Sequence, residues 1–163
     1  MKFNSLKEVF KYLDTINDAD NLIYDDCKNH SYINEDWYKK ILEEVLKDKP
    51  KRVIDVGSNL NQFGYLFANE GIEYIGIDIA TTLPNNYGIM QPLITENIKF
   101  IRADYRDVKE YFKNDVIISC LCVNYLIPIE EVECKKLIIN GLDKNKKPIA
   151  RVYKNAEEVG AYE

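Results

Sequence analysis

The segment that most constrains the fold is residues 52–79, RVIDVGSNLNQFGYLFANEGIEYIGIDI. Residues 52–56 form a short apolar run with a β-branched core, which is typical of a strand buried on both faces of a parallel sheet. Apolar residues at helical spacing follow, up to Gly71, where a helix would end. Residues 74–79 are again apolar and β-branched. The order strand, turn, helix, strand predicts a βαβ unit.

Gly57 and Asp78 mark the part of this unit that suggests a ligand. Gly57 directly follows the first strand, where it permits a tight turn and a close approach of the backbone to a ligand. Asp78 ends the second strand about 20 residues later, the separation expected when an acid holds the ribose hydroxyls of a nucleoside. A nicotinamide-type G-x-G-x-x-G turn is the weaker alternative, because Asn59 and Gln62 occupy its second and third glycine positions.

Length and charge narrow the class of protein. The chain has 163 residues, enough for a real core, so we expect a single domain over residues 1–163. A net charge of −5 and a pI near 5.1 argue against nucleic acid and membrane surfaces as partners. No window reaches the roughly 18 apolar residues of a membrane span, and residues 1–13 lack the apolar core of a secretion signal. We therefore expect a cytoplasmic protein.

The cysteines predict neither disulfides nor a metal centre. Cys27, Cys120, Cys122 and Cys134 form no C-x-x-C pair, and we expect them to be buried reduced thiols. Cys27 and His30 have C-x-x-H spacing, which is a weak metal signal without a second pair of ligands.

Two amphipathic helices are expected before the first strand. Residues 5–16 and residues 34–47 both carry apolar side chains at helical spacing. Ser5 and Asn34 are the candidate N-caps of these helices. The polar and aromatic segment between them, residues 17–33, is expected to be irregular.

Beyond Asp78, strands and helices continue to alternate. The expected strands are residues 99–102, 115–121 and 148–153. The expected helices are residues 92–97, 108–112 and 128–139, the last ended by Gly141. This order predicts an α/β fold with a doubly wound, mostly parallel, Rossmann-like sheet of about five strands. The Rossmann-like core would span residues 51–153, after an N-terminal helical region at residues 1–48.

Four segments resemble motifs of the class I S-adenosylmethionine-dependent methyltransferases. VIDVGSNLN resembles the first motif of that family, in its variant D-x-G-[AS]-N-x-G, and GIDI resembles its acidic strand end. IRADYRDV is similar to the segment whose acid contacts adenine, and DVIISCLCVNYL to the fourth strand with its active-site loop. The segments are residues 53–61, 76–79, 101–108 and 115–126. The resemblance implies S-adenosylmethionine as cofactor and methyl transfer as reaction.

The resemblance also assigns roles to residues of this chain. Asp78 would accept from the ribose hydroxyls and Asp104 from the adenine amine, with Ile79 or Tyr105 beside the ring. The implied cofactor-binding residues are Asp55, Gly57, Ser58, Asn59, Asp78, Ile79, Asp104, Tyr105 and Ser119. Because the methyl group already sits on a positively charged sulfur, transfer can rest largely on proximity and orientation.

The candidate catalytic residues are Asn124, Tyr125 and His30. Asn124 and Tyr125 stand where relatives bind the methyl acceptor, and His30 is the available base near neutral pH if the acceptor must lose a proton. Aromatic residues near the N-terminus either close over the cofactor as a lid or pack the helices on the sheet. These aromatic residues are Tyr24, Tyr32 and Trp37.

The chain departs from the family pattern in three places. Asn59 and Asn61 replace glycines of the first motif, and asparagine tolerates left-handed backbone. The strands that usually follow the fifth strand are expected to be missing, which leaves a sheet edge for a second copy or a partner protein. The loop after residues 115–121 lacks the [DNS]-P-P-[YFW] motif of amino-methylating nucleic-acid enzymes, which argues against that activity.

Two functions follow from the sequence. The first is an S-adenosylmethionine-dependent methyltransferase that acts on a small-molecule or protein acceptor. The alternative is a non-catalytic methyltransferase-like module that binds a nucleoside-type ligand or a partner protein.

Overall fold

A seven-stranded mixed sheet forms the centre of the computed structural model, which describes residues 1–18, 20–79, 90–120, 122–142, 144–145 and 148–162. The spatial order of the strands is β3-β2-β1-β4-β5-β6-β7. The strands are β1 (Arg52–Val56), β2 (Glu73–Ile77), β3 (Ile98–Ile101), β4 (Val116–Cys120), β5 (Lys136–Leu142), β6 (Pro148–Lys154) and β7 (Glu157–Tyr162). The strands β1 to β5 pair in parallel, whereas β6 and β7 add an antiparallel hairpin.

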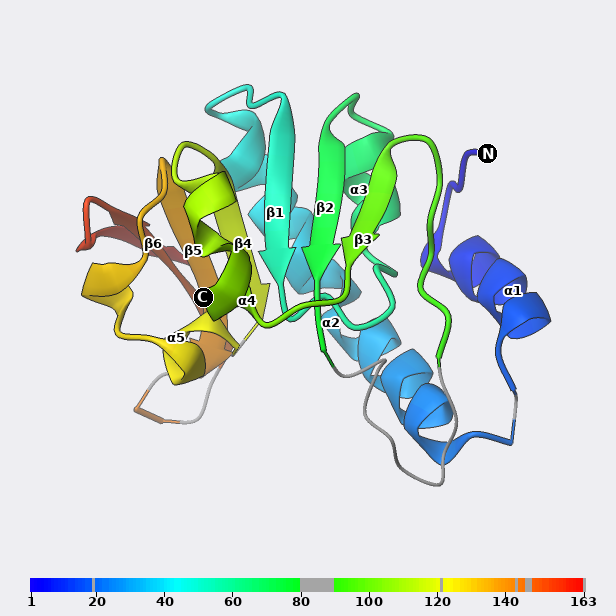
Figure 1. Ribbon diagram of the computed structural model, residues 1–163. Helices are drawn as coiled ribbons and strands as arrows, with labels where there is room; N and C mark the ends of the chain where they lie inside the picture. Colours follow the sequence, from blue (N-terminus) through cyan, green and yellow to red (C-terminus); the bar gives the residue numbers. More distant parts are fainter. Residues whose placement is uncertain (19, 80–89, 121, 143, 146–147, 163) are drawn as a thin grey trace.

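Helices cover both faces of the sheet (Figure 1). The helices α2 (Leu22–Leu46) and α3 (Gly64–Ala68) lie behind the sheet in this view, and α1 (Leu6–Ile16) lies to the right of β3. In front lie α4 (Tyr105–Val108) and α5 (Val123–Leu126). The 3-10 helices η2 (Lys109–Phe112) and η3 (Ile129–Glu131) pack in the same core as these two helices. Each face has its own apolar core, and the side chains of alternate strand residues enter one core or the other.

The first helix confirms the sequence prediction. Ser5 caps α1, since its Oγ accepts a hydrogen bond from the backbone N–H of Glu8 at 3.2 Å. Glu8 in turn accepts from the backbone N–H of Asn4 at 2.8 Å, so the cap is a shifted form of the capping box. The buried face consists of Leu6, Val9, Phe10 and Leu13.

The second helix is much longer than predicted, and Asn34 is not its cap. The helix α2 begins after Asn21, whose side chain accepts from the backbone N–H groups of Ile23 and Tyr24. Asn34 lies within the helix and donates to the carbonyl of His30 at 2.9 Å. The sequence predicts irregular structure for residues 17–33 because polar residues interrupt the apolar spacing there. In the structure the buried face of α2 includes polar groups, which are hydrogen-bonded within the protein.

The C-terminal part of the sheet corrects three predictions. Residues 128–139 do not form a helix, because only η3 is helical and β5 begins at Lys136. The predicted fifth strand, residues 148–153, is β6, which lies between β5 and β7 and is not an exposed edge. The sheet therefore has seven strands, and the antiparallel strands that were expected to be missing are present.

The segment before β3 is also simpler than expected. Residues 92–97 form no helix; Leu93 instead donates its backbone N–H to the carbonyl of Leu60 at 2.8 Å. Residues 80–89 of this crossover lie outside the described residues. Among the described residues, no helix has both the length and the apolar character that crossing a membrane requires.

Candidate functional site

The carboxyl ends of β1, β2 and β4 meet at one edge of the sheet, at the bottom of Figure 1. The glycine loop, residues 57–62, leaves β1 at this edge. The backbone N–H groups of Gly57 and Ser58 both donate to the carbonyl of Ile77, at 2.8 and 3.3 Å. Gly57 has φ +82°, and a Cβ atom there would stand 2.6 Å from Cβ of Cys122. Only glycine fits this position without displacing Cys122.

The two asparagines of the loop replace glycine without breaking the turn. Asn59 and Asn61 have φ +52° and +57°, in the left-handed region that asparagine tolerates. The backbone N–H of Asn59 donates to Oδ2 of Asp78 at 2.7 Å. This hydrogen bond joins the glycine loop to the acid at the end of β2, the two features that the sequence paired.

The side chain of Asn61 points into the protein interior. Its side chain is fully buried and its Nδ2 donates to the carbonyls of Leu93 and Lys99, at 3.2 and 3.1 Å. Its Oδ1 packs against Gly76 in β2. The side chain therefore fills space behind the loop and lines neither of the hollows described next.

Two hollows flank Gly57. The sheet-edge hollow, of about 80 Å³, is mostly apolar and is bordered by Ile79, Asp104, Tyr105 and other residues at the strand ends. The α2 hollow, of about 140 Å³, lies between the glycine loop and α2. Each is smaller than the roughly 300 Å³ at which pockets for drug-sized ligands begin. A larger ligand would have to extend across Gly57 into both hollows.

Asp104 and Tyr105 lie where the sequence placed them, but Asp104 is already paired. Its carboxylate caps α4 by accepting from the backbone N–H of Arg106 at 2.9 Å, and it holds the Arg106 guanidinium through both oxygens. These bonds lower the pKa of Asp104. Tyr105 is buried, burial raises its pKa to about 12, and its hydroxyl has no hydrogen-bond partner among the described residues.

Asp55 and Ser119 lie beneath the site and line neither hollow. Asp55 is buried and accepts from the hydroxyl of Tyr74. Ser119 donates from Oγ to the carbonyl of Val56 at 2.9 Å and accepts from the backbone N–H of Val123 at 2.9 Å. These hydrogen bonds stabilise the strand ends and the start of α5, so Asp55 and Ser119 support the site from below.

The candidate catalytic residues are divided between two places. His30 is exposed and borders the α2 hollow together with Ser58 and Asn59. Asn124 and Tyr125 lie exposed on α5, with Tyr125 76% exposed, and neither borders the sheet-edge hollow or the α2 hollow. The structure does not bring His30 and α5 into one cavity.

The N-terminal aromatic residues pack rather than form a lid. Tyr24 is buried and donates to Asp14, and burial raises its pKa above the usual range. Tyr32 lies 5.7 Å from the ring of Phe10, and Trp37 packs against the core under α2. None of the three borders the two hollows.

Sequence reasoning missed a clamp between the glycine loop and α2. Gln62 accepts from the backbone N–H of Leu60 at 3.1 Å and donates to Oγ of Ser31 at 3.0 Å. Ser31 continues the chain by donating to the carbonyl of Cys27 at 2.6 Å. Nothing in the pattern signals this clamp, because residues 22–33 were expected to be irregular.

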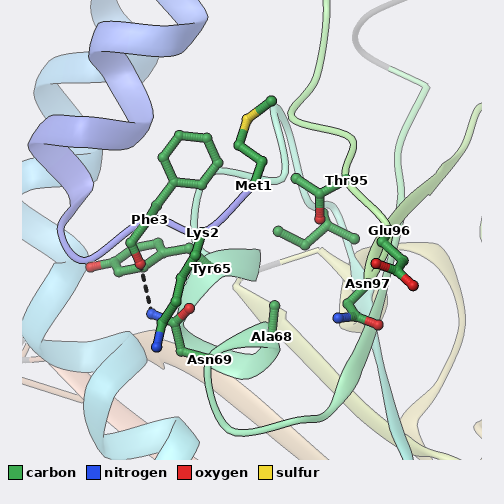
Figure 2. Close-up of a pocket in the computed structure, with 10 residues that line it drawn as sticks. Met1, Lys2, Phe3, Tyr65, Ala68, Asn69, Thr95, Glu96 and Asn97 are labelled. Atoms are coloured by element: carbon green, nitrogen blue, oxygen red, sulfur yellow. Dashed lines mark hydrogen bonds between the residues drawn. The ribbon is translucent and has the colours of Figure 1, made fainter.

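A further hollow, of about 190 Å³, lies at the opposite edge of the sheet. Figure 2 shows Met1 and Phe3 from the N-terminal segment facing Tyr65 and Asn69, with Thr95 across the hollow. Ligands of open α/β sheets bind at the carboxyl ends of the strands, so this hollow is not the candidate site. No group of three or more His, Cys, Asp or Glu side chains suited to a metal occurs in the described part of the chain.

Comparisons with known proteins support the fold of this chain and do not identify its function. No protein-family model and no curated relative matches the sequence. WbdD, a bifunctional kinase-methyltransferase, matches with a TM-score of 0.50 and 12% identity, over 70% of this chain and 31% of WbdD. A structure from Nostoc punctiforme assigned as an O-methyltransferase matches with a TM-score of 0.50 and 14% identity, over 71% of this chain and 40% of that one. The chain thus spans less than half of either protein, and it has a methyltransferase-like fold.

Proposed function

We propose that this chain binds S-adenosylmethionine at the glycine loop and transfers its methyl group to a small-molecule or protein acceptor in the cytoplasm. One observation carries the proposal. The Asn59 N–H joins the glycine loop to Asp78 at 2.7 Å, at the carboxyl edge of the sheet and between two hollows that share Gly57. In an open α/β sheet this is the place where a nucleoside cofactor binds.

The nucleoside fits the sheet-edge hollow better than the α2 hollow. The walls of the sheet-edge hollow are mostly apolar, as a purine ring requires, and Asp78 and Asp104 stand at its border. Asp78 accepts a hydrogen bond from the loop, and its carboxylate is the group to which the ribose hydroxyls would donate. The amino-acid end of the cofactor would then cross Gly57 toward the α2 hollow, where polar side chains and loop backbone line the wall.

This chain's residues supply position more than chemistry. The cofactor itself supplies the methyl group on a positively charged sulfur, so transfer needs a bound acceptor in line with it. His30 borders the α2 hollow and is the group that would take a proton from the acceptor.

A non-catalytic binding module is the alternative, and specific contacts favour it. Cys122 lies directly against Gly57 and borders the sheet-edge hollow. Both oxygens of Asp104 are engaged by Arg106, which leaves less capacity for an adenine amine. In this alternative a nucleoside-type ligand occupies the sheet-edge hollow alone, or the outer side of β7 pairs with a partner.

Calorimetric titration with S-adenosylmethionine and S-adenosylhomocysteine tests the proposal. Micromolar binding is expected for the wild-type protein, and Asp78→Ala should weaken it about tenfold to a hundredfold, the value of a hydrogen bond to a charged group. Asp107→Ala is the matched control, because Asp107 is an exposed acid on α4 that borders neither flanking hollow. Folded wild-type protein that gives no heat with either compound would refute cofactor binding. Production of S-adenosylhomocysteine with an acceptor separates the enzyme from the binding module.

A further inference from the structure

A group of buried polar side chains lies behind the glycine loop, on the face of the sheet that α2 and α3 cover. Asp55 pairs in register with Gly76, so its carboxyl group lies on the face where Gly76 leaves space. A Cβ atom at Gly76 would stand 1.8 Å from Oδ1 of Asn61 and 2.4 Å from Oγ of Ser58. These two loop side chains therefore fill the space beside Asp55. All of these side chains are less than 5% exposed.

If Asp55 is ionised, this group of side chains has more hydrogen-bond acceptors than donors. Oδ2 of Asp55 accepts from the hydroxyl of Tyr74. Oδ1 of Asp55, Oγ of Ser58 and Oδ1 of Asn61 have no hydrogen-bond partner among the described residues. The hydroxyl of Ser58 supplies one hydrogen, whereas the carboxylate and the amide oxygen are both acceptors. A proton on Asp55 would supply a second hydrogen to this group of acceptors.

The surroundings favour that proton. The titratable groups that face Asp55 or its neighbours are Asp78 at the end of β2, Tyr74 in β2 and Tyr38 in α2, and none is a cation. Burial and the negative charge of Asp78 raise the pKa of Asp55 to about 7, against the opposing effect of the Tyr74 hydrogen bond.

We propose that Asp55 is a positioning residue that acts as a neutral carboxylic acid, and that losing its proton loosens the glycine loop. Ser58 and Asn61 belong to the loop, and their neighbour Asn59 carries the N–H that reaches Asp78. The proton on Asp55 therefore controls the backbone that borders both flanking hollows. The consequence for ligand affinity rests on the proposed cofactor site, whereas the consequence for loop order does not.

Unfolding of wild type and Asp55→Asn between pH 5 and pH 8.5, without ligand, tests the first consequence. Asparagine keeps an acceptor for Tyr74 and offers an N–H in place of the acid proton, so it mimics the neutral acid at every pH. Because the pKa of Asp55 is raised on folding, its favourable contribution is lost as the pH rises toward about 7. Wild type should therefore lose stability relative to Asp55→Asn up to about pH 7, with a constant difference above it. Parallel curves would overturn the proposal.

A second measurement uses the wild-type chain alone. The infrared carbonyl band of a protonated carboxyl group should be present at pH 6, absent at pH 8.5, and missing from Asp55→Asn at both. Absence of the band at pH 6 from wild type would overturn the proposal.

The ligand arm separates this proposal from the proposed function. The wild-type affinity for S-adenosylhomocysteine should fall about tenfold per pH unit above pH 7, and that of Asp55→Asn should not. Diverging unfolding curves without any binding would support the role of Asp55 and refute the cofactor site. Binding with the same pH profile in both proteins would support the cofactor site and overturn the role of Asp55.

Discussion

Replacing Gly76 with alanine tests how the glycine loop is held against β2. The new Cβ atom would lie 1.8 Å from Oδ1 of Asn61 and 2.4 Å from Oγ of Ser58, far inside contact distance. Asn61 cannot yield freely, because it is fully buried and its Nδ2 holds the carbonyls of Leu93 and Lys99. The loop must therefore move, or Asn61 must give up both hydrogen bonds.

The magnitude follows from these two costs. Overpacking a well-packed core typically costs about 1–3 kcal/mol. Losing the two hydrogen bonds of Asn61 would add about 1 kcal/mol each. We expect the free energy of unfolding to fall by about 3–5 kcal/mol, which for a chain of this size lowers Tm by about 6–20 °C.

The assay is thermal unfolding of wild type, Gly76→Ala and a matched control, Gly160→Ala. Gly160 is an exposed strand glycine, and its Cβ atom would meet nothing closer than Cβ of Val152 at 4.0 Å. The control should unfold within about 2 °C of wild type, because an exposed substitution usually changes stability little. A Gly76→Ala protein as stable as the control would refute the packing of Asn61 and Ser58 against β2.

Two further predictions concern other parts of the chain. Lys136→Met should lower the free energy of unfolding by about 3 kcal/mol in urea, because Lys136 is buried and ion-paired with acids at the end of α2, whereas the exposed Lys135→Met should change it little. Equal effects of the two substitutions would contradict this role. Cys27 and Cys134 should react with iodoacetamide at pH 8 at least about 100-fold more slowly than free cysteine, because burial raises the pKa of each thiol to about 11. Peptide mass spectrometry measures both rates, and reaction at the free-thiol rate in the folded protein would contradict the burial of these side chains.

The βαβ unit was predictable because its local signals agree with its environment. β1 and β2 are buried strands whose residues are apolar almost throughout, so both could be recognised as strands without knowing the fold. Gly71 ends the α3 region with φ +73°, as a glycine after a helix commonly does. The spacing of Gly57 and Asp78 indicated that the loop and the acid belong to one site, and in the structure the Asn59 N–H donates to Asp78.

The errors arose where tertiary contacts decide the structure. Residues 22–33 were expected to be irregular because the polar groups that face the sheet, such as Ser31, find their partners only in the folded chain. The sequence predicts a helix over residues 128–139, which overlaps the observed strand β5, because an apolar run that follows a proline fits either a helix or a strand. Lys136, a charged residue at the start of that run, is buried where Glu44 of α2 and Asp48, which follows α2, form ion pairs with it.

The site was predictable in position but not in detail. Gly57, Asp78, Asp104 and Tyr105 do lie at one edge of the sheet, because the carboxyl ends of parallel strands meet there. The pairing of Asp104 with a nearby arginine depends on side-chain conformation, which the sequence does not specify. The direction of Asn61 depends equally on carbonyls of a segment far along the chain.

Amide hydrogen exchange, measured with and without saturating S-adenosylhomocysteine, tests the central claim most directly. The ligand should slow exchange at residues 57–59, at residues 77–79 and at residues 103–105, which together border the two flanking hollows. The amides around the larger hollow at the opposite edge, such as Asn69 and Asn97, should be unchanged. Protection confined to that opposite edge, or no protection anywhere, would contradict a cofactor site at the glycine loop.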